Sequence, residues 1–252
     1  MTIYFTPAEV LAATKGKCLA PGTVAKFAGV ATDTRSLAAG SLFVALSGER
    51  FDGHDFIEAA VRQGAAGIVA SREPAGVPSA VAVFLVPDTR LAYQDLARFH
   101  RCRFQMPVIA VTGSNGKTST KDMIAAVLST QRNILKTEAN FNNEIGLSQT
   151  LLKIGPEHEA VVVEMGMRGL GEIAGLAATA LPTVGVVTNV GETHLERLGS
   201  VENIATAKAE LVQALPMDGI AVLNGDDVHV MAMRQKTNAR VVTYGTGPEL
   251  DV

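Results

Sequence analysis

The chain alternates short, uniformly apolar segments with longer segments in which apolar residues recur at helical spacing. Short apolar runs of this kind are typical of strands buried on both faces, and the longer segments are typical of amphipathic helices. The alternation predicts an α/β fold with a mainly parallel sheet covered by helices. We expect strands at 42–46, 67–70, 82–86, 108–112, 160–164, 183–189 and 219–224. We expect helices at 55–64, 89–103, 118–130, 145–153, 171–179 and 201–215.

Local signals mark the ends of some elements and a division of the chain. Asp55 is the expected N-cap of the helix at 55–64, and Ser200 is the expected N-cap of the helix at 201–215. A break around Pro107 predicts two domains, residues 1–105 and residues 106–252. The last residues resemble one more strand without a closing helix, so we expect the second domain to be incomplete at its C-terminal end.

Composition narrows the class of partner. The 252 residues carry a net charge of -3 without long basic runs, which argues against a nucleic-acid partner and favours small molecules. Cys18 and Cys102 form no C-x-x-C pattern, which suits a reducing compartment and excludes a cysteine-rich metal site. We find no leader pattern and no membrane-spanning segment, so we expect a cytoplasmic protein without membrane insertion.

The segment 108–120, VIAVTGSNGKTST, carries the most specific chemistry in the chain. An apolar strand runs into a glycine turn followed by a helix, an arrangement in which backbone N–H groups can converge on phosphate oxygens. Lys117 would reach the outer phosphates, and the Thr118 hydroxyl would hold magnesium. Val111 stands where the usual phosphate loop has its first glycine, so this loop is the shorter G-x-x-G-K-T form. The nucleotide-binding residues expected here are Thr112, Gly113, Ser114, Asn115, Gly116, Lys117, Thr118 and Ser119.

Two further residues follow predicted strands directly. Glu164 ends the strand at 160–164, where a carboxylate can meet the metal of a nucleotide bound on the loop. His194 follows the strand at 183–189, where an imidazole can bind metal or orient a ligand carboxylate. The alternative in each case is a side chain that only faces water. Ligands of parallel sheets bind beyond the carboxyl ends of strands, which favours the functional interpretation for both residues.

Lys208 interrupts an apolar helix face. Its neighbours on that face are Val201, Ile204, Leu211 and Leu215. The lysine either extends its ammonium group to water or is a desolvated amine with a lowered pKa that can react or change its charge. The pattern alone leaves both interpretations open.

Several polar loops are weaker candidates. Asn143 lies in an asparagine-rich stretch before a helix, which it could simply cap, and Asn224 ends a strand, where an amide can bind an adenine edge or form an Asx turn. Two loops flank the first predicted strand and are either binding loops or ordinary turns. Their candidate residues are Thr34, Arg35, Asp52, Gly53 and His54.

Together these residues resemble the Mur ligases of bacterial cell-wall synthesis, and within that family the MurF type. The resemblance covers almost the whole chain. Its specific parts are SLFVALSGERFDGHDFIEAAVRQGA, TGSNGKTST, NFNNEIGLSQTLL, VVVEMGMRGLGEI and TNVGETHLERLGSVENIATAKAEL. Thr34 stands where a serine is usual in the family.

The resemblance implies a UDP-substrate domain followed by a P-loop-type central ATPase domain, and ATP-dependent amide bond formation through an acyl phosphate. The implied substrates are UDP-N-acetylmuramoyl-tripeptide and D-alanyl-D-alanine, with ATP and Mg²⁺ as cofactors and a monomeric protein. It also implies that Lys117 and Thr118 bind phosphate and magnesium, that Glu164 binds magnesium and that His194 binds a second magnesium. Lys208 would be carbamylated and so become an anionic group beside the metal. Asn143 would lie near the metal, Asn224 near adenine, and the two loops of the first domain would bind the UDP substrate.

The family has a third, carboxyl-terminal domain that this chain does not reach. We therefore expect the isolated chain to bind UDP-linked substrate and nucleotide but to ligate poorly or not at all. Two other functions compete with this one: a P-loop kinase or simple NTPase, and a noncatalytic module that binds a UDP-linked precursor. A kinase gives no reason for the segment LFVALSGERFDGHDF, whereas a UDP-substrate domain does.

Overall fold

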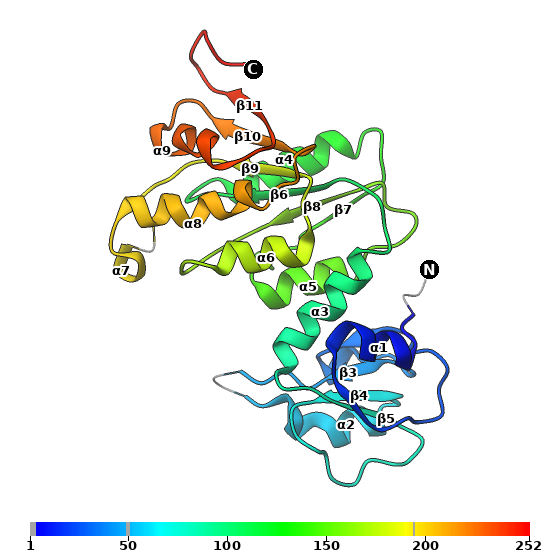
Figure 1. Ribbon diagram of the computed structural model, residues 1–252. Helices are drawn as coiled ribbons and strands as arrows, with labels where there is room; N and C mark the ends of the chain where they lie inside the picture. The colour runs from blue at the N-terminus through cyan, green and yellow to red at the C-terminus, as the bar shows by residue number, and fades with distance from the viewer. Residues whose placement is uncertain (1–3, 49–50, 194) are drawn as a thin grey trace. The chain divides into compact units, whose positions relative to one another are not determined.

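A computed structural model describes residues 4–48, 51–193 and 195–252 of the chain (Figure 1). The chain divides into two compact units, residues 1–99 and residues 100–252. The helix α3, Thr89–Arg101, spans the division between them. Each unit contains its own sheet, and each is described separately below.

The first unit contains a small sheet in its described residues. Its strands follow the order β1-β5-β4-β3-β2, in which β1 pairs antiparallel with β5 and the other pairs are parallel. The strands β3 and β4 are fully buried, as expected for parallel strands covered on both faces. The elements are α1 Pro7–Thr14, β1 Lys17–Ala20, β2 Val30–Ala31, η1 Thr34–Ser36, β3 Leu42–Val44, η2 Gly53–Phe56, α2 Ile57–Arg62, β4 Gly67–Ala70 and β5 Ala82–Leu85.

The second unit is built on a larger sheet of parallel strands. In the described residues these strands follow the order β11-β10-β9-β6-β8-β7. The chain places β8 on one side of β6 and β9 on the other, so a topological switch point lies at the carboxyl end of β6, where ligands of such sheets bind. The strands are β6 Val108–Thr112, β7 Ile134–Lys136, β8 Ala160–Glu164, β9 Val184–Val187, β10 Ile220–Asn224 and β11 Arg240–Tyr244.

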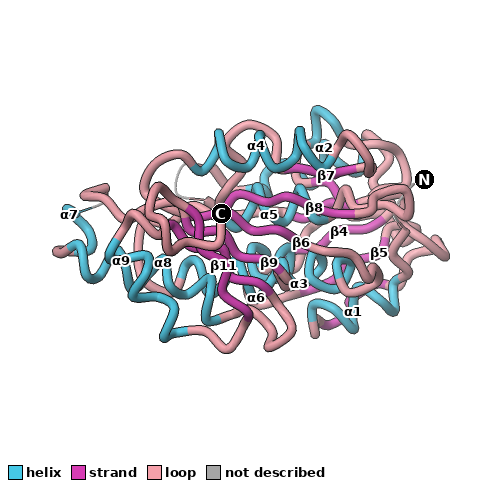
Figure 2. The backbone as a smooth tube through the Cα atoms, turned by 90° about the horizontal axis from the view of Figure 1, so that it is seen from above, coloured by secondary structure: helices cyan, strands magenta, loops and turns pink. Residues whose placement is uncertain are grey.

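Helices cover both faces of this larger sheet (Figures 1 and 2). The helix α4 packs on one face, where its Ala125 joins a core with Val111 and Val162. The helix α8 packs on the other face, where Ala209 and Val212 join a core with Val187. The helices of this unit are α4 Lys117–Leu128, α5 Glu144–Leu151, α6 Glu172–Ala180, α7 Leu195–Leu198, α8 Val201–Gln213, α9 Val228–Met231 and η3 Ala232–Lys236.

The predicted fold class is confirmed, and most of the expected elements are present within a few residues of their expected bounds. Ser200 caps α8 as expected, because its hydroxyl accepts from the N–H of Asn203. The expectation for Asp55 was wrong. Asp52 caps the 3-10 turn η2 instead, and α2 begins directly after that turn without a side-chain cap.

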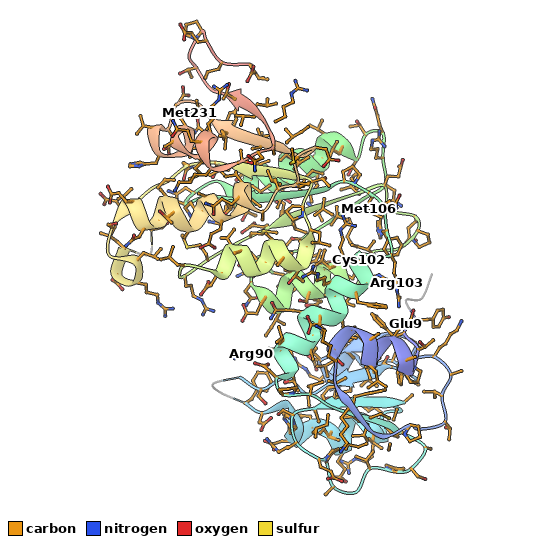
Figure 3. The ribbon with its side chains drawn as sticks, in the orientation of Figure 1. Glu9, Arg90, Cys102, Arg103, Met106 and Met231 are labelled. Atoms are coloured by element: carbon orange, nitrogen blue, oxygen red, sulfur yellow. The ribbon has the colours of Figure 1, made fainter. Side chains whose placement is uncertain are left out.

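The two cysteines are free thiols. Cys18 is half-buried, and Cys102 is exposed beside Arg103 just after α3 (Figure 3). Among the helices of residues 4–48, 51–193 and 195–252, none has the length and apolar character that a membrane crossing requires.

Candidate functional site

The loop between β6 and α4 is shaped by two glycines with positive φ. Gly113 has φ 150°, and a Cβ at this position would overlap Oγ1 of Thr188. Gly116 has φ 79° and serves as the N-cap of α4, so no side chain of its own covers the first amides of that helix. The positive end of α4 therefore meets the loop at the carboxyl end of β6, an arrangement suited to bind an anion.

The loop is held from the end of the neighbouring strand β9. The N–H of Ser114 donates to Asn189 O at 2.9 Å, and the N–H of Asn115 donates to Oδ1 of the same residue at 2.9 Å. Thr188 Oγ1 donates to Asn115 O at 2.7 Å, and the N–H of Gly191 donates to Ser114 Oγ at 2.8 Å. These contacts fix the loop without using the amides at the start of α4.

Lys117 lies in the first helical turn and folds back over the loop. Its Nζ donates to Gly113 O at 2.8 Å and to Ser114 O at 3.1 Å. Burial lowers the pKa of Lys117, and the negative charge of Glu164 acts in the opposite direction. The ammonium group thus lies over the loop that is shaped for an anion.

Glu164 is brought to this loop by strand register, because it pairs with Val111 on the neighbouring strand β6. Its side chain is 2 % exposed. Oε2 accepts from the hydroxyl of Thr118 at 2.8 Å, and Oε1 accepts from Nδ2 of Asn142 at 2.8 Å. A carboxylate and a hydroxyl side by side are the hard oxygen donors that Mg²⁺ prefers. Within the described residues, no group of three or more His, Cys, Asp and Glu side chains is placed to hold a metal ion.

Lys208 is buried in α8, with 2 % of its surface exposed. This burial of the side chain favours the desolvated amine over one that extends to water. Burial, together with the positive charge of Lys117, lowers the pKa of Lys208 to about 7. A substantial share of this amine is therefore neutral near neutral pH, in contrast to an ordinary lysine. His194, the partner expected for this region, lies outside the described residues.

Asn143 and Asn224 make the local structural contacts that the sequence had left as alternatives to ligand binding. Oδ1 of Asn143 accepts from the N–H of Gly146 and caps α5, while the preceding Asn142 is the residue that contacts Glu164. Asn224 donates from Nδ2 to Thr188 O at 2.8 Å, and its Oδ1 accepts from the N–H of Asp226 in an Asx turn. Asn142 was missed, because the asparagine-rich stretch does not show which asparagine caps α5 and which one contacts Glu164.

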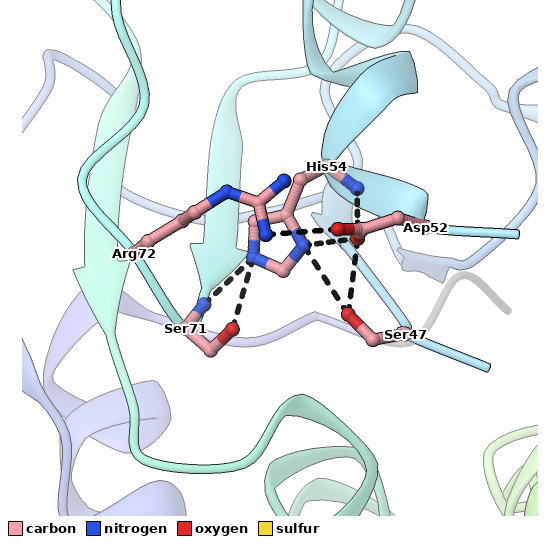
Figure 4. Close-up of polar contacts among 5 residues, drawn as sticks. All are labelled: Ser47, Asp52, His54, Ser71 and Arg72. Carbon is pink, nitrogen blue, oxygen red and sulfur yellow. Dashed lines mark hydrogen bonds and ion pairs between the residues drawn. The ribbon is translucent and has the colours of Figure 1, made fainter. Parts of the chain in front are cut away.

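In the first unit, the polar residues at the carboxyl ends of β3 and β4 form a connected cluster (Figure 4). The N–H of Ser71 donates to Nε2 of His54 at 2.9 Å, so this nitrogen is an acceptor and Nδ1 carries the proton toward Asp52 Oδ1 at 2.6 Å. Asp52 also accepts from the hydroxyl of Ser47 and pairs with Arg72 at 2.8 Å. Contacts with His54 keep the pKa of Asp52 well below its usual range. The side chains of Asp52 and His54 thus hold the loop that follows β3.

The remaining candidates of the first unit lie at neighbouring positions. Gly53 is required by close packing, because a Cβ there would lie 2.7 Å from Leu46 N. Arg35 pairs with Asp33 at 2.6 Å after β2 and is otherwise exposed to solvent. This pairing lowers the pKa of Asp33 to about 2. Thr34 begins the short turn η1 between these two charged residues. Arg72 was not expected from sequence, because a single arginine after a strand has no distinguishing pattern.

Comparison with known proteins places these features in a family. The sequence matches the Mur ligase family, catalytic domain, over residues 26–101 and the Mur ligase middle domain over residues 111–251. It is 51 % identical over 217 residues to a UDP-N-acetylmuramoyl-tripeptide–D-alanyl-D-alanine ligase of Synechocystis, covering 86 % of this chain and 48 % of the relative. The identity to the Escherichia coli ligase of the same name is 45 %, covering 79 % of this chain and 43 % of that protein. The chain spans about half the length of the curated relatives it matches.

Solved structures agree with the sequence comparison. MurF from Acinetobacter baumannii superposes with a TM-score of 0.90 at 32 % identity, covering 98 % of this chain and 54 % of that one. MurF from Thermotoga maritima, solved in complex with ADP, superposes with a TM-score of 0.78 at 35 % identity, covering 86 % of this chain and 50 % of that one. The middle-domain match over residues 111–251 covers more than half of this chain, and the chain therefore belongs to the Mur ligase family.

Proposed function

We propose that this chain binds ATP and UDP-N-acetylmuramoyl-tripeptide for a MurF-type reaction, in which D-alanyl-D-alanine is joined to the tripeptide by an amide bond. The contact between Thr118 and Glu164 beside the glycine loop carries the proposal, because it puts a hydroxyl and a buried carboxylate where a nucleotide's metal would lie. The names of the Synechocystis and Escherichia coli relatives support the choice of substrates.

The proposed chemistry activates a carboxylate that is otherwise a poor electrophile. The terminal carboxylate of the tripeptide attacks the γ-phosphorus of ATP, an O–P bond forms, and ADP leaves. The amine of D-alanyl-D-alanine then attacks the carbonyl carbon, and phosphate leaves from the tetrahedral intermediate as the amine loses its proton. In the first step Lys117 would exchange its loop carbonyls for phosphate oxygens and offset the charge on the transferring group.

The residues at the loop fit magnesium by their donor chemistry. Thr118 and Glu164 would hold one ion, and His194 and a carbamylated Lys208 would hold a second. When bound, Mg²⁺ would offset the negative charge of the phosphates. Asn142 would keep the carboxylate of Glu164 oriented from the side opposite Thr118.

Carbamylation of Lys208 forms a bond between Nζ and the carbon of CO₂ and releases a proton to solvent. The reaction requires a neutral amine, and the pKa of about 7 that burial gives to Lys208 supplies one. The product is an anion, which removes the repulsion between Lys208 and the nearby positive charge of Lys117.

The other residues that we propose to bind ligand lie in loops or at the ends of strands. The loop residues 112–119 would enclose the phosphates, Asn143 would lie near the metal and Asn224 near adenine. In the first unit, Thr34, Arg35 and the loop with Asp52, Gly53 and His54 would bind the UDP portion of the substrate. Because Asp52 and His54 are engaged with each other, the backbone of their loop is the better candidate for direct contact with uridine. A monomeric, cytoplasmic protein completes the proposal.

Calorimetric titration with ATP in the presence of Mg²⁺ tests the nucleotide site. We expect the chain to bind ATP and Lys117→Ala to weaken binding at least tenfold, whereas Lys136→Ala, on an exposed strand residue, should leave it unchanged. Equal binding by all three proteins would contradict the nucleotide site.

A second titration, with UDP-N-acetylmuramoyl-tripeptide, distinguishes the ligase function from the two alternative functions. Family membership already argues against a P-loop kinase. Binding of the UDP-linked precursor without any binding of ATP would favour the noncatalytic module.

A further inference from the structure

Lys121 is a second buried lysine of the larger unit, and nothing in the proposed reaction uses it. It lies in the second turn of α4, four residues after Lys117, and its side chain is 2 % exposed. Residues with this spacing share one helix face, so Lys121 follows Lys117 on the side of α4 that packs on the sheet. Burial keeps the Lys121 ammonium group from reaching a ligand in solvent.

Lys121 contacts the end of β7 and one carboxylate of its own helix. Its Nζ donates to the carbonyl of Thr137 at 3.0 Å, and Asp122 Oδ1 lies at 3.4 Å. The same carboxylate is 2.7 Å from the exposed Lys136, so it is shared between two lysines. A buried ammonium group is costly unless its hydrogen bonds are well satisfied. The hydrogen bond to the Thr137 carbonyl is therefore the principal buried contact of this charge.

Thr137 links this lysine to the candidate metal site. Its side chain is completely buried, and its Oγ1 accepts from the N–H of Glu164 at 3.1 Å. Its own N–H donates to Val162 O at 2.9 Å, which extends the pairing of β7 with β8 by one residue. Thr137 thus contacts Lys121 through its carbonyl and Glu164 through its hydroxyl.

The loop that begins at Thr137 returns to the same carboxylate. Asn142 Nδ2 donates to Oε1 of Glu164 at 2.8 Å, and the N–H of Gly166 donates to Asn142 O at 2.9 Å. The loop is therefore held at both ends against the carboxyl end of β8, with Glu164 between the two attachments. Movement at Thr137 would reach the backbone of Glu164 and the loop that presents Asn142.

We propose that Lys121 is a positioning residue for magnesium: by anchoring the Thr137 carbonyl it sets the loop 137–143 and, through it, the orientation of Glu164. This inference rests on the proposed nucleotide site. Lys121 does not touch the ion or the phosphates, and acts through the geometry of residues that do. Supporting partners of metal-binding carboxylates influence metal affinity in this way.

The test compares Lys121→Met with Lys136→Met, which removes a lysine from the same carboxylate but from an exposed position. ATP binding is titrated over a range of Mg²⁺ concentrations and also in EDTA. We expect Lys121→Met to raise the half-saturating Mg²⁺ concentration about tenfold, in the range known for such supporting residues, and to leave binding in EDTA unchanged. Lys136→Met should match the unsubstituted chain. Equal Mg²⁺ dependence in both variants would overturn the proposal.

A second measurement needs no ligand. Hydrogen exchange of the segment 137–143 and of the Glu164 amide should be faster in Lys121→Met and unchanged in Lys136→Met. If Lys121→Met does not fold, Thr137→Val removes the hydroxyl that accepts from Glu164 and should raise the Mg²⁺ requirement in the same direction. Unchanged exchange in Lys121→Met, or an unchanged Mg²⁺ requirement in Thr137→Val, would contradict the anchoring role.

The two proposals fail in different ways. If the unsubstituted chain does not bind ATP at saturating Mg²⁺, the nucleotide site falls and the magnesium role of Lys121 with it. If it binds and only the difference between the lysine variants is missing, the nucleotide site stands and the inference about Lys121 alone is wrong.

Discussion

The hydroxyl of Thr118 donates to Oε2 of Glu164 at 2.8 Å, which joins the first turn of α4 to the carboxyl end of β8. The two residues are 46 positions apart in sequence and meet because β6 and β8 are parallel neighbours in the sheet. The loop of β6 and the last residue of β8 therefore reach the same edge. This contact places an oxygen donor from each element side by side at the candidate nucleotide site.

Glu164→Gln should weaken the part of ATP binding that depends on Mg²⁺ and spare the part that does not. The amide keeps an acceptor for Thr118 but removes the negative charge that favours Mg²⁺. We expect ATP binding in Mg²⁺ to weaken at least tenfold, and binding in EDTA to change little or to improve. Titration calorimetry under both conditions measures the difference. Glu159→Gln, on an exposed glutamate that pairs with Arg132, is the matched control and should behave as the unsubstituted chain.

The sheet could be predicted because parallel strands buried on both faces leave a strong mark in the sequence. The strands Val108–Thr112 and Ala160–Glu164 have the bounds that their apolar runs predict. Shorter elements escaped prediction, because the three residues of β7 and the two of β2 are too few to show a period. The cap at Asp55 was wrong because a 3-10 turn capped by Asp52 precedes the helix, and both aspartates have the same propensity to cap.

Site residues could be predicted where a strand end determines their position. They could not be predicted where the direction of the side chain determines what the residue contacts. The position of Thr118 could be inferred from the glycine-loop motif, and that of Glu164 from its place at the end of a parallel strand. Whether Asn142 or Asn143 faces Glu164 depends on which asparagine caps α5, and three successive polar residues give no signal for that choice. Lys121 lies among polar residues at the start of α4, so its burial becomes apparent only when β7 and β8 are placed against that helix.

Lys208 should make stability depend on pH. Burial and the charge of Lys117 lower the pKa of Lys208 to about 7 in the fold, whereas in the unfolded chain it has the ordinary value of 10.5. Between these values the unfolded state binds more protons, so stability rises with pH from about 7 to about 10.5. For the unmodified amine in CO₂-free buffer we expect a gain of about 2 kcal/mol between pH 7 and 9.

Urea unfolding followed by circular dichroism across this pH range measures the effect, since the chain has no tryptophan. Lys208→Met should flatten the rise, while Lys153→Met, which removes an exposed partner of Glu138, should retain it. The same slope in all three proteins would show that Lys208 is not desolvated in solution.

Arg101→Met should destabilise the larger unit. The buried guanidinium of Arg101 donates to four carbonyls, those of Phe104, Met106, Ala180 and Leu181. Two of them lie at the C-terminal end of α6, where a positive charge is favourable. Burial lowers the pKa of Arg101.

Removing the guanidinium leaves those buried acceptors without their donor. We expect a loss of about 2–4 kcal/mol in the free energy of unfolding, measured from the urea midpoint. Arg132→Met removes an exposed arginine that pairs with Glu159 and should change stability by less than about 1 kcal/mol. Similar losses in both variants would mean that the carbonyls of Arg101 find water or other donors.

Three glycine-to-alanine substitutions should distinguish the effect of a steric overlap from the effect of backbone strain. At Gly113 the new methyl group would overlap Thr188 Oγ1, and the backbone has φ 150°, so Gly113→Ala should abolish ATP binding. At Gly116 the space is open but φ is 79°, so Gly116→Ala should lower stability by about 1–2 kcal/mol through strain alone. Gly175 lies inside α6 with open space around it, and Gly175→Ala should raise stability by about 0.5–1 kcal/mol. Urea midpoints measure the stability of the three variants, and ATP titrations measure their nucleotide binding. Normal ATP binding by Gly113→Ala would contradict the overlap with Thr188 and would show that the loop can accept a methyl group at this position.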